Sequence, residues 1–301
     1  SRKDIVDYRA DFQCLTSDAL SRGYINRPAT SGFAQRGADD GQLRTYRLAL
    51  ACTGEYAQYF FIFSETTDAE RKAKVLAAMV TLMVRTNGIY ERDFGIHMNL
   101  IANNDAIIYL TAATDPWASE WNTKTQQTID AVIGSANYDI GHLVHKGSNN
   151  GNAGCIGCVC TAGSKGSAFT SHSAPEGDPF VVDYTTHEMG HQFGGNHTFT
   201  FSNESGTAAQ MEPGSGSTIM GYAGITGSTD VQPHSDDYFH ARSIEQITDY
   251  IKLSTGGGAC AVVTVTGNAT PVANAGVDYT IPKSTPFTLT GTGSDADGAD
   301  V

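Results

Sequence analysis

Two histidines and a glutamate stand close together in the segment His187-Glu188-Met189-Gly190-His191. Histidines four residues apart on a helix lie on the same face, one turn apart, so both imidazoles can bind one metal ion. Zinc accepts such nitrogen ligands at about 2.0 to 2.1 Å. The short motif also occurs in ordinary helices, where its histidines are partly exposed or hydrogen-bonded in the core. A further ligand is needed to distinguish a zinc site.

The chain continues to Gly194 and His197, which complete the motif H-E-x-x-H-x-x-G-x-x-H. A glycine can take positive φ and end the helix, which would bring His197 back over the same metal. Five fixed residue types, at roughly one in twenty each over about 300 starting positions, match by chance with odds on the order of 1 in 10,000. The sequence therefore predicts one zinc ion held by His187, His191 and His197.

Three neutral imidazoles leave the charge of zinc uncompensated and one coordination position open, which is typical of catalytic rather than structural zinc. Water would fill that position. Glu188 can remove the proton of this water as it attacks a carbonyl carbon, and can then pass the proton to the leaving amine. The motif therefore predicts peptide-bond hydrolysis with Glu188 as the catalytic base.

A second motif downstream is Ser217-Thr218-Ile219-Met220-Gly221-Tyr222. Together with the long histidine motif, it resembles the metzincin clan of zinc endopeptidases, in which a methionine in a tight turn lies beneath the zinc. Met220 matches that Met-turn, where its part is structural support. The resemblance implies an α/β fold, with a twisted mixed sheet, helices and an irregular C-terminal subdomain.

Within the clan, the sequence resembles bacterial secreted reprolysin-like (adamalysin-like) enzymes over about residues 42–260. The segments that carry this likeness are RTYRLALACTGEYAQYF, YDIGHLVH, DPFVVDYTTHEMGHQFGGNHTF and PGSGSTIMGYAG. By the resemblance, Cys160 would pair with Cys260 and tie the exit of an edge strand to the final helix. We expect protein or peptide substrates to lie along this edge, near residues 153–160, as an added strand.

Two positions depart from the reprolysin-like pattern. Thr198 follows the third histidine, where reprolysins usually carry aspartate. The turn also reads Met-Gly-Tyr, as in astacin- and serralysin-like enzymes, where a tyrosine two residues after the methionine can ligate zinc. Tyr222 therefore has two interpretations. It is either a zinc ligand that later stabilises the substrate oxyanion, or a packed tyrosine with its hydroxyl bonded to backbone.

The cysteines form an even set, compatible with three disulfides and an oxidising compartment: Cys14, Cys52, Cys155, Cys158, Cys160 and Cys260. Besides the pair implied by the resemblance, we expect Cys14 to pair with Cys52 and, by elimination, Cys155 with Cys158. One alternative is a metal site at Cys155, Cys158 and Cys160, although no second suitably spaced pair follows. Another is that Cys14 acts as a latency thiolate on zinc, as in zymogens of related metzincins, which would leave an odd cysteine.

Hydrophobic periodicity predicts the elements that must position these residues. Helices are expected at residues 67–85, 119–133, 179–193 and 241–253, the first with Thr67 and Glu70 as a capping box. Strands are expected at residues 43–51, 96–101, 106–110 and 140–145. This order favours a mixed sheet with helical crossovers. Residues 147–163 fit an irregular edge strand with bulges, and residues 194–240 have no regular pattern.

Composition divides the chain into three predicted parts. Residues 1–41 are an N-terminal extension or the remnant of a pro-segment, and residues 42–260 are the catalytic domain. After three glycines, residues 268–301 resemble the opening strands of bacterial immunoglobulin-like or PKD-like repeats, and would begin a β-sandwich. In this last part, three acidic residues could help bind Ca²⁺ or form a solvated acidic turn: Asp295, Asp297 and Asp300.

Bulk composition excludes several classes of protein. The 301 residues are 40% hydrophobic and 17% charged, as in a loop-rich globular protein. Against 19 Lys and Arg there are 32 Asp and Glu, and the net charge of −13 disfavours nucleic acid as a partner. No apolar run is long enough to span a bilayer, and the polar start lacks the core of a signal peptide. We expect a secreted, extracellular monomer whose export signal has been removed.

Together these features predict a secreted zinc endopeptidase. A second hypothesis is a surface adhesion or matrix-binding protein, in which an inactive metalloprotease-like domain serves only as a scaffold. A third is a zinc hydrolase that acts on a non-peptide ester or amide. The intact Glu188 argues against the scaffold, and the long motif with its Met-turn argues against the non-peptide hydrolase.

Overall fold

The strand predicted at residues 43–51 is the centre of the fold, as β2 (Gln42–Cys52). In the computed structural model of the chain, Leu48 and Leu50 point into one hydrophobic core, whereas Ala49 and Ala51 point into another. Side chains alternate between the two faces of a strand, so both faces of this sheet are covered. The residues that the structure describes are 13–18, 40–61, 65–201, 208–269 and 271–297.

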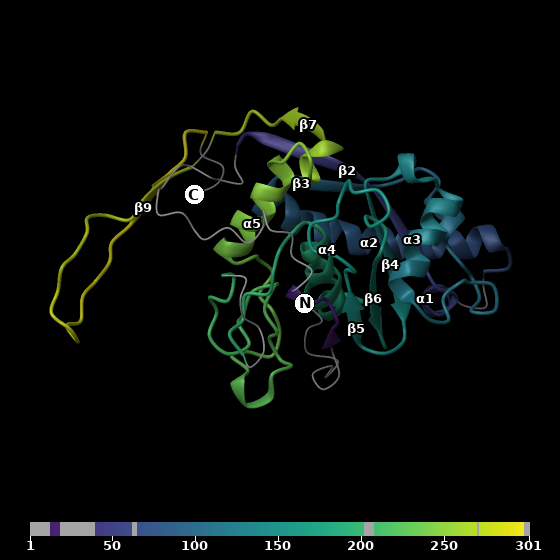
Figure 1. Ribbon diagram of the computed structural model, residues 1–301, viewed down its shortest axis with the longest axis horizontal. Coiled ribbons are helices and arrows are strands. Elements are labelled where there is room, and N and C mark those ends of the chain that lie inside the picture. The colour runs from purple at the N-terminus through teal and green to yellow at the C-terminus, as the bar shows by residue number, and fades with distance from the viewer. Residues whose placement is uncertain (1–12, 19–39, 62–64, 202–207, 270, 298–301) are drawn as a thin grey trace.

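A mixed sheet runs through the described part of the chain in the order β1-β5-β6-β4-β2-β3, and β7 also pairs with β2. Strands β3, β2, β4 and β6 are parallel to one another, β5 is antiparallel to β6, and β1 is parallel to β5. The remaining strands are β1 (Gln13–Cys14), β3 (Ile96–Leu100), β4 (Ile140–Lys146), β5 (Asn150–Asn152), β6 (Ala168–His172) and β7 (Val262–Val265). The predicted α/β class with a twisted mixed sheet is therefore confirmed (Figure 1).

Helices cover both faces of the sheet. On one face lie α1 (Gly54–Phe60), α2 (Asp68–Phe94), α4 (His187–Gln192) and α5 (Ala241–Lys252). On the other face, α3 (Trp121–Val132) buries Ile129 against Leu143 and Phe169. The two layers of helix account for the burial of β6, of most of β4 and of the second half of β2, from Leu48 to Cys52.

Helix α2 shows how local sequence sets the bounds of an element. Thr67 accepts a hydrogen bond from the Glu70 amide, and the Glu70 carboxylate accepts one from the Thr67 amide, so the predicted capping box is present. The helix runs past the predicted end at residue 85 and stops at Gly95, which has φ 63°. Glycine adopts this left-handed conformation without the cost of a Cβ, which explains the stop.

Three expectations about the framework need correction. The segment predicted as a strand at residues 106–110 is a 3₁₀ turn, Asn104–Ile107, followed by a single bridge between Ile108 and Cys52. Its anchor is Asn104, whose side-chain amide bonds both backbone groups of Leu50. Strand β6 and helix α1 were not predicted, and the predicted edge strand at 147–163 is regular only at β5.

The main sheet continues beyond residue 260, where the sequence suggested a boundary. Strand β7 pairs antiparallel with the start of β2, from Val262 opposite Thr45 to Val265 opposite Gln42. Beyond it, β8 (Val272–Asn274) and β9 (Thr292–Ser294) form a two-stranded arm that projects from the domain (Figure 1). The β-sandwich expected from the repeat-like sequence remains a prediction.

Two disulfides are present, Cys155–Cys158 and Cys160–Cys260. The expected bond between Cys14 and Cys52 is absent, and both residues are outside any disulfide. Their strands β1 and β2 are separated by β5, β6 and β4, hence by roughly 19 Å at a strand spacing of about 4.8 Å. Bridged Cα atoms lie about 4.4 to 6.8 Å apart, so this pairing is geometrically excluded.

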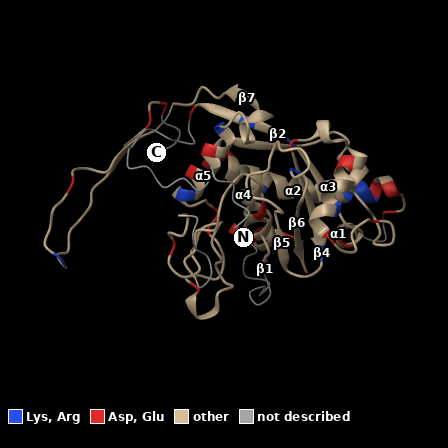
Figure 2. Ribbon diagram, viewed as in Figure 1, with Lys and Arg blue, Asp and Glu red and all other residues tan. Residues whose placement is uncertain are grey.

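Charged residues gather on the helices and loops, and the strands β4, β5 and β6 are almost free of them (Figure 2). One ion pair joins Arg47, near the middle of β2, to Asp139, just before β4, at 2.7 Å. Across the described residues, no helix combines the length and apolar character needed to cross a membrane.

Candidate metal centre and active site

The helix predicted at residues 179–193 is built from two parts. A π-helical segment, Pro179–Thr186, leads directly into α4, which carries the first two histidines of the motif. The Thr186 hydroxyl donates to the Val181 carbonyl at 2.7 Å, and the Tyr90 hydroxyl donates to the Thr186 carbonyl at 3.1 Å. These bonds fix the start of α4 against α2, so the histidines are presented from a rigid element.

The three predicted ligands converge. His191 Nε2 lies 3.2 Å from His187 Nε2 and 3.0 Å from His197 Nε2, and all three side chains are buried. Gly194 has φ 103° and follows the last turn of the helix, as the motif predicts. The chain therefore turns back and places His197 beside the two helical histidines.

The hydrogen bonds of the rings test whether this cluster suits a metal. His187 Nδ1 lies 2.6 Å from the Ile219 carbonyl, and His191 Nδ1 lies 2.8 Å from the Gly195 carbonyl. A carbonyl accepts only, so each Nδ1 carries the proton and each Nε2 presents a lone pair. Lone pairs facing one another at about 3 Å repel unless a cation lies between them. The residues present therefore fit a zinc ion.

The environment keeps these rings uncharged. Burial, and then the neighbouring His197, lower the pKa of His187 to about 3. Burial also lowers the pKa of His191 well below its usual value, and both neighbouring histidines add to the effect. Neutral imidazole is the form that ligates a metal.

Glu188 lies beside the cluster and is fully buried. Burial raises the pKa of its carboxyl to about 7, while hydrogen bonds from Cys14 and Thr16 oppose that rise. A carboxylate with a raised pKa is better matched to proton transfer near neutral pH than an exposed one. The position and environment of Glu188 therefore suit the role of a general base.

Met220 lies in a tight turn, closed by the Gly221 amide donating to the Thr218 carbonyl at 2.9 Å. A Cβ added at Gly190, between the two helical histidines, would come within 2.6 Å of the Met220 sulfur. The turn therefore packs directly against the metal-binding helix, as the Met-turn hypothesis predicts. The Thr198 amide donates to the Met220 carbonyl at 3.1 Å, which joins the turn to the third ligand.

The sequence did not reveal the buried carboxylate of Glu212. One of its oxygens accepts the Ser217 and Thr218 amides at 2.9 and 3.0 Å. The other accepts the hydroxyls of Thr218 and Thr198. Although burial alone would raise it, these four hydrogen bonds hold the pKa of Glu212 below its usual value. Glu212 thereby connects the Met-turn to the residue after His197.

Tyr222 lies beside the ligands. Its ring stacks on Phe199 with centroids 4.0 Å apart and meets the His197 ring edge-on at 4.8 Å. Its hydroxyl donates to the Cys14 carbonyl at 3.4 Å. Both interpretations of Tyr222 made from the sequence therefore remain predictions.

The described part of the N-terminal segment lies in the site. Cys14 Sγ is 3.6 Å from His191 Nε2, and the thiol and the three imidazoles form one group of potential ligand atoms within 4.8 Å of one another. The structure thus favours the alternative in which Cys14 faces the metal over a bond to Cys52. The sequence around Cys14 contained no pattern that marked it, among the six cysteines, as the one that faces the metal.

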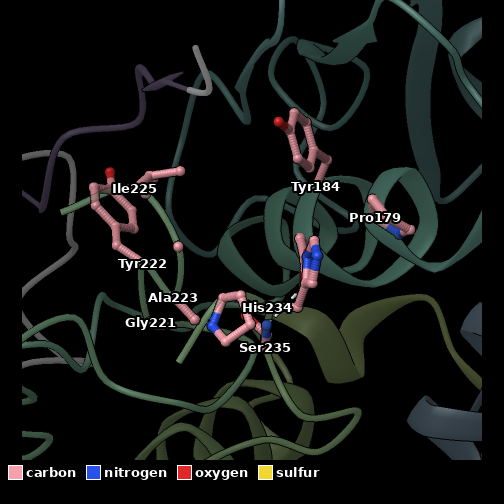
Figure 3. A pocket seen from close by; sticks show the side chains of 11 residues that line it. Pro179, Tyr184, Gly221, Tyr222, Ala223, Ile225, His234 and Ser235 are labelled. Carbon is pink, nitrogen blue, oxygen red and sulfur yellow. Dashed lines mark hydrogen bonds and ion pairs between the residues drawn. The ribbon is translucent and has the colours of Figure 1, made fainter. Parts of the chain in front are cut away.

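A small pocket opens next to Tyr222 (Figure 3). Its volume is about 20 Å³, room for roughly one water molecule. Asp183 and His234 line it as a pair, with His234 Nδ1 2.9 Å from the Asp183 carboxylate. Tyr222 lines the pocket and its ring meets that of His197, so the pocket adjoins the histidine cluster. The pair of Asp183 and His234 was not predicted, because its members are 51 residues apart.

The acidic residues proposed for calcium lie far along the chain, in the arm. Asp295 and Asp297 accept backbone hydrogen bonds from Asp297 and Ala269, whereas Asp300 lies outside the described residues. Among the residues described, the histidine and cysteine group is the one cluster with metal-ligand geometry. Calcium binding therefore stays a prediction.

The fold and the site together define a metallopeptidase of the metzincin type. Residues 42–250 match the family described as Metallo-peptidase family M12B Reprolysin-like. The match covers more than half of the chain, so the protein belongs to this family. No curated protein matches the chain. The matched range contains the histidine motif, Glu188 and the Met-turn.

Proposed function

We propose that this protein is a zinc endopeptidase that hydrolyses peptide bonds of protein substrates. The observation that carries the proposal is the histidine cluster, in which His191 Nε2 lies 3.2 Å from His187 Nε2 and 3.0 Å from His197 Nε2, with Glu188 buried beside it. Zinc bound there would act as a Lewis acid on the substrate carbonyl and lower the pKa of water.

Glu188 would accept the proton of the attacking water and return it to the leaving amine. Its buried, up-shifted carboxyl is suited to hold a proton between these two events. Tyr222, beside His197, is the candidate donor to the oxyanion that forms from the scissile carbonyl. The inactive-scaffold hypothesis gives Glu188 no role, and we do not favour it.

We further propose that the chain as described is latent. Cys14 faces the ligand cluster, and a thiolate is a strong zinc ligand that would take the coordination position needed by water. The strand that carries it, β1, pairs with β5 at residues 150–151, directly before residues 153–160, where we expect an extended substrate.

Two disulfides support the proposal that the protein works outside the cell. The bond between Cys160 and Cys260 closes a loop of 100 residues around the site. Disulfides persist in oxidising compartments and are rare where thiols are kept reduced.

The test uses a double variant, Cys14→Ala with Thr16→Val, because the native segment fills the site. We expect it to cleave a mixture of denatured proteins, to lose activity with 1,10-phenanthroline and to regain it with added Zn²⁺. The same background with Glu188→Gln should keep one zinc ion per chain and lose about 10²- to 10⁴-fold in rate. A folded, zinc-loaded double variant in which the Leu15 amide exchanges freely with solvent, so that the segment has left the cleft, and which still shows no hydrolysis would refute the proposed function.

A further inference from the structure

The N-terminal segment touches the predicted general base as well as the ligand cluster. The Thr16 hydroxyl donates to Glu188 Oε2 at 3.0 Å, and both side chains are buried. The Ala153 amide donates to the same hydroxyl oxygen at 2.7 Å. An amide can only donate, so the single proton of the hydroxyl is directed to the carboxylate.

This contact opposes the chemistry expected of Glu188. A general base must lie within hydrogen-bond reach of the proton that it removes. Here the Thr16 hydroxyl occupies Glu188 Oε2, so a water molecule would have to displace it to bind that oxygen. It also uses the Ala153 amide, a donor that an extended substrate on this edge would need.

Bonds that do not involve the thiol hold Thr16 in place. The Leu15 amide donates to the Gly151 carbonyl at 2.8 Å, and the Asn152 side chain donates to the Leu15 carbonyl at 3.2 Å. On the other side, Asp18 accepts the His197 amide at 3.2 Å and the Gln210 side chain at 3.0 Å. Release of Cys14 from the metal would therefore leave the segment attached at both flanks of Thr16.

We propose that Thr16 is a second inhibitory contact, which blocks Glu188 independently of the thiol at the metal. The proposal rests on the proposed function, because it assigns a block to the base of that reaction. Its consequence is that covalent modification or oxidation of the Cys14 thiol alone does not give full activity. Full activity requires the segment that carries Thr16 to leave the cleft.

The experiment compares zinc-loaded full chains that all carry Cys14→Ala. With Thr16 unchanged, we expect low protease activity and slow hydrogen exchange at the Leu15 amide. Thr16→Val keeps the shape of the side chain but removes the hydroxyl. We expect it to raise activity and to speed Leu15 exchange, each by about 10- to 100-fold, the factor for one hydrogen bond to a carboxylate. Thr16→Ser retains the hydroxyl and is the matched control, with values close to those of the Cys14→Ala chain.

The outcomes separate this inference from the proposed function. Equal activity and equal Leu15 exchange with threonine, serine and valine at position 16 would overturn the second contact and leave the protease intact. If Leu15 exchange differs between the variants but none of them hydrolyses protein, the Thr16 contact is supported and the proposed protease function is refuted. Thermal unfolding and zinc content measured on each variant identify a chain that has not folded, and Thr16→Ala then replaces Thr16→Val.

Discussion

The Glu212 carboxylate accepts a hydrogen bond from the Thr198 hydroxyl, across the gap between the third metal ligand and the Met-turn. Thr198 stands where reprolysin-like sequences usually carry aspartate, directly after His197. In the structure, Glu212 supplies a carboxylate next to Thr198 from a different segment of the chain. The same carboxylate also accepts hydrogen bonds from Thr218 at the start of the turn. Glu212 is therefore a positioning residue, which acts on the metal centre through Thr198 and the turn.

Glu212→Gln should weaken zinc binding. An amide cannot accept all four hydrogen bonds, so the loop of His197 and the Met-turn would shift relative to α4. Loss of such outer partners typically costs about 10- to 100-fold in metal affinity. The zinc affinity is measured by competition with a chromophoric chelator. Adding Thr198→Asp to Glu212→Gln should recover part of the affinity, and unchanged affinity in Glu212→Gln would reduce Glu212 to a packing residue.

Glu212 should also make stability depend on pH. Its folded pKa lies below its unfolded value of about 4.3, so its contribution is complete above that pH and is lost as pH falls through the folded pKa. At pH 7 and without metal, we expect the free energy of unfolding of the unsubstituted protein to be about 1 to 3 kcal/mol higher than that of Glu212→Gln. Urea titrations at pH 7 and pH 3 should show that this difference shrinks with acid. A constant difference would contradict the assignment.

Tyr222→Phe tests the predicted oxyanion role in the Cys14→Ala, Thr16→Val background. We expect zinc binding and KM close to those of the background, and kcat lower by about 10²- to 10³-fold, as for loss of one oxyanion donor. Steady-state kinetics on a defined peptide give both parameters. A kcat equal to that of the background would return Tyr222 to the packing role, consistent with its stacking on Phe199.

The pocket beside Tyr222 should limit the side chain that a substrate can place next to the cleaved bond. At about 20 Å³ it accepts only a small group unless the wall moves. His234→Ala removes part of the wall and should shift cleavage toward larger side chains. Sequencing of cut sites in a peptide library before and after the substitution checks this. An unchanged cleavage profile would mean that substrates do not enter this pocket.

The sequence by itself predicted the cluster of three histidines, because His187, His191 and His197 lie within one short stretch of chain. His187, Glu188 and His191 share a helix, and Gly194 supplies the positive φ that returns His197. The start of helix α2 could also be predicted, because its capping box and apolar face are local patterns. Such features depend on neighbours a few residues away, and the residue types alone specify them.

Only the tertiary structure decided which distant segments meet at this centre. Cys14 and Thr16 reach it because β1 pairs with β5, and this pairing leaves Cys14 four strands away from Cys52. Short strands such as β6, buried on both sides, lack the alternation that reveals a half-exposed strand. The contacts of Thr16 with Glu188 and of His234 with Asp183 join residues 172 and 51 positions apart. They follow from how the sheet and loops pack, and no local pattern encodes them.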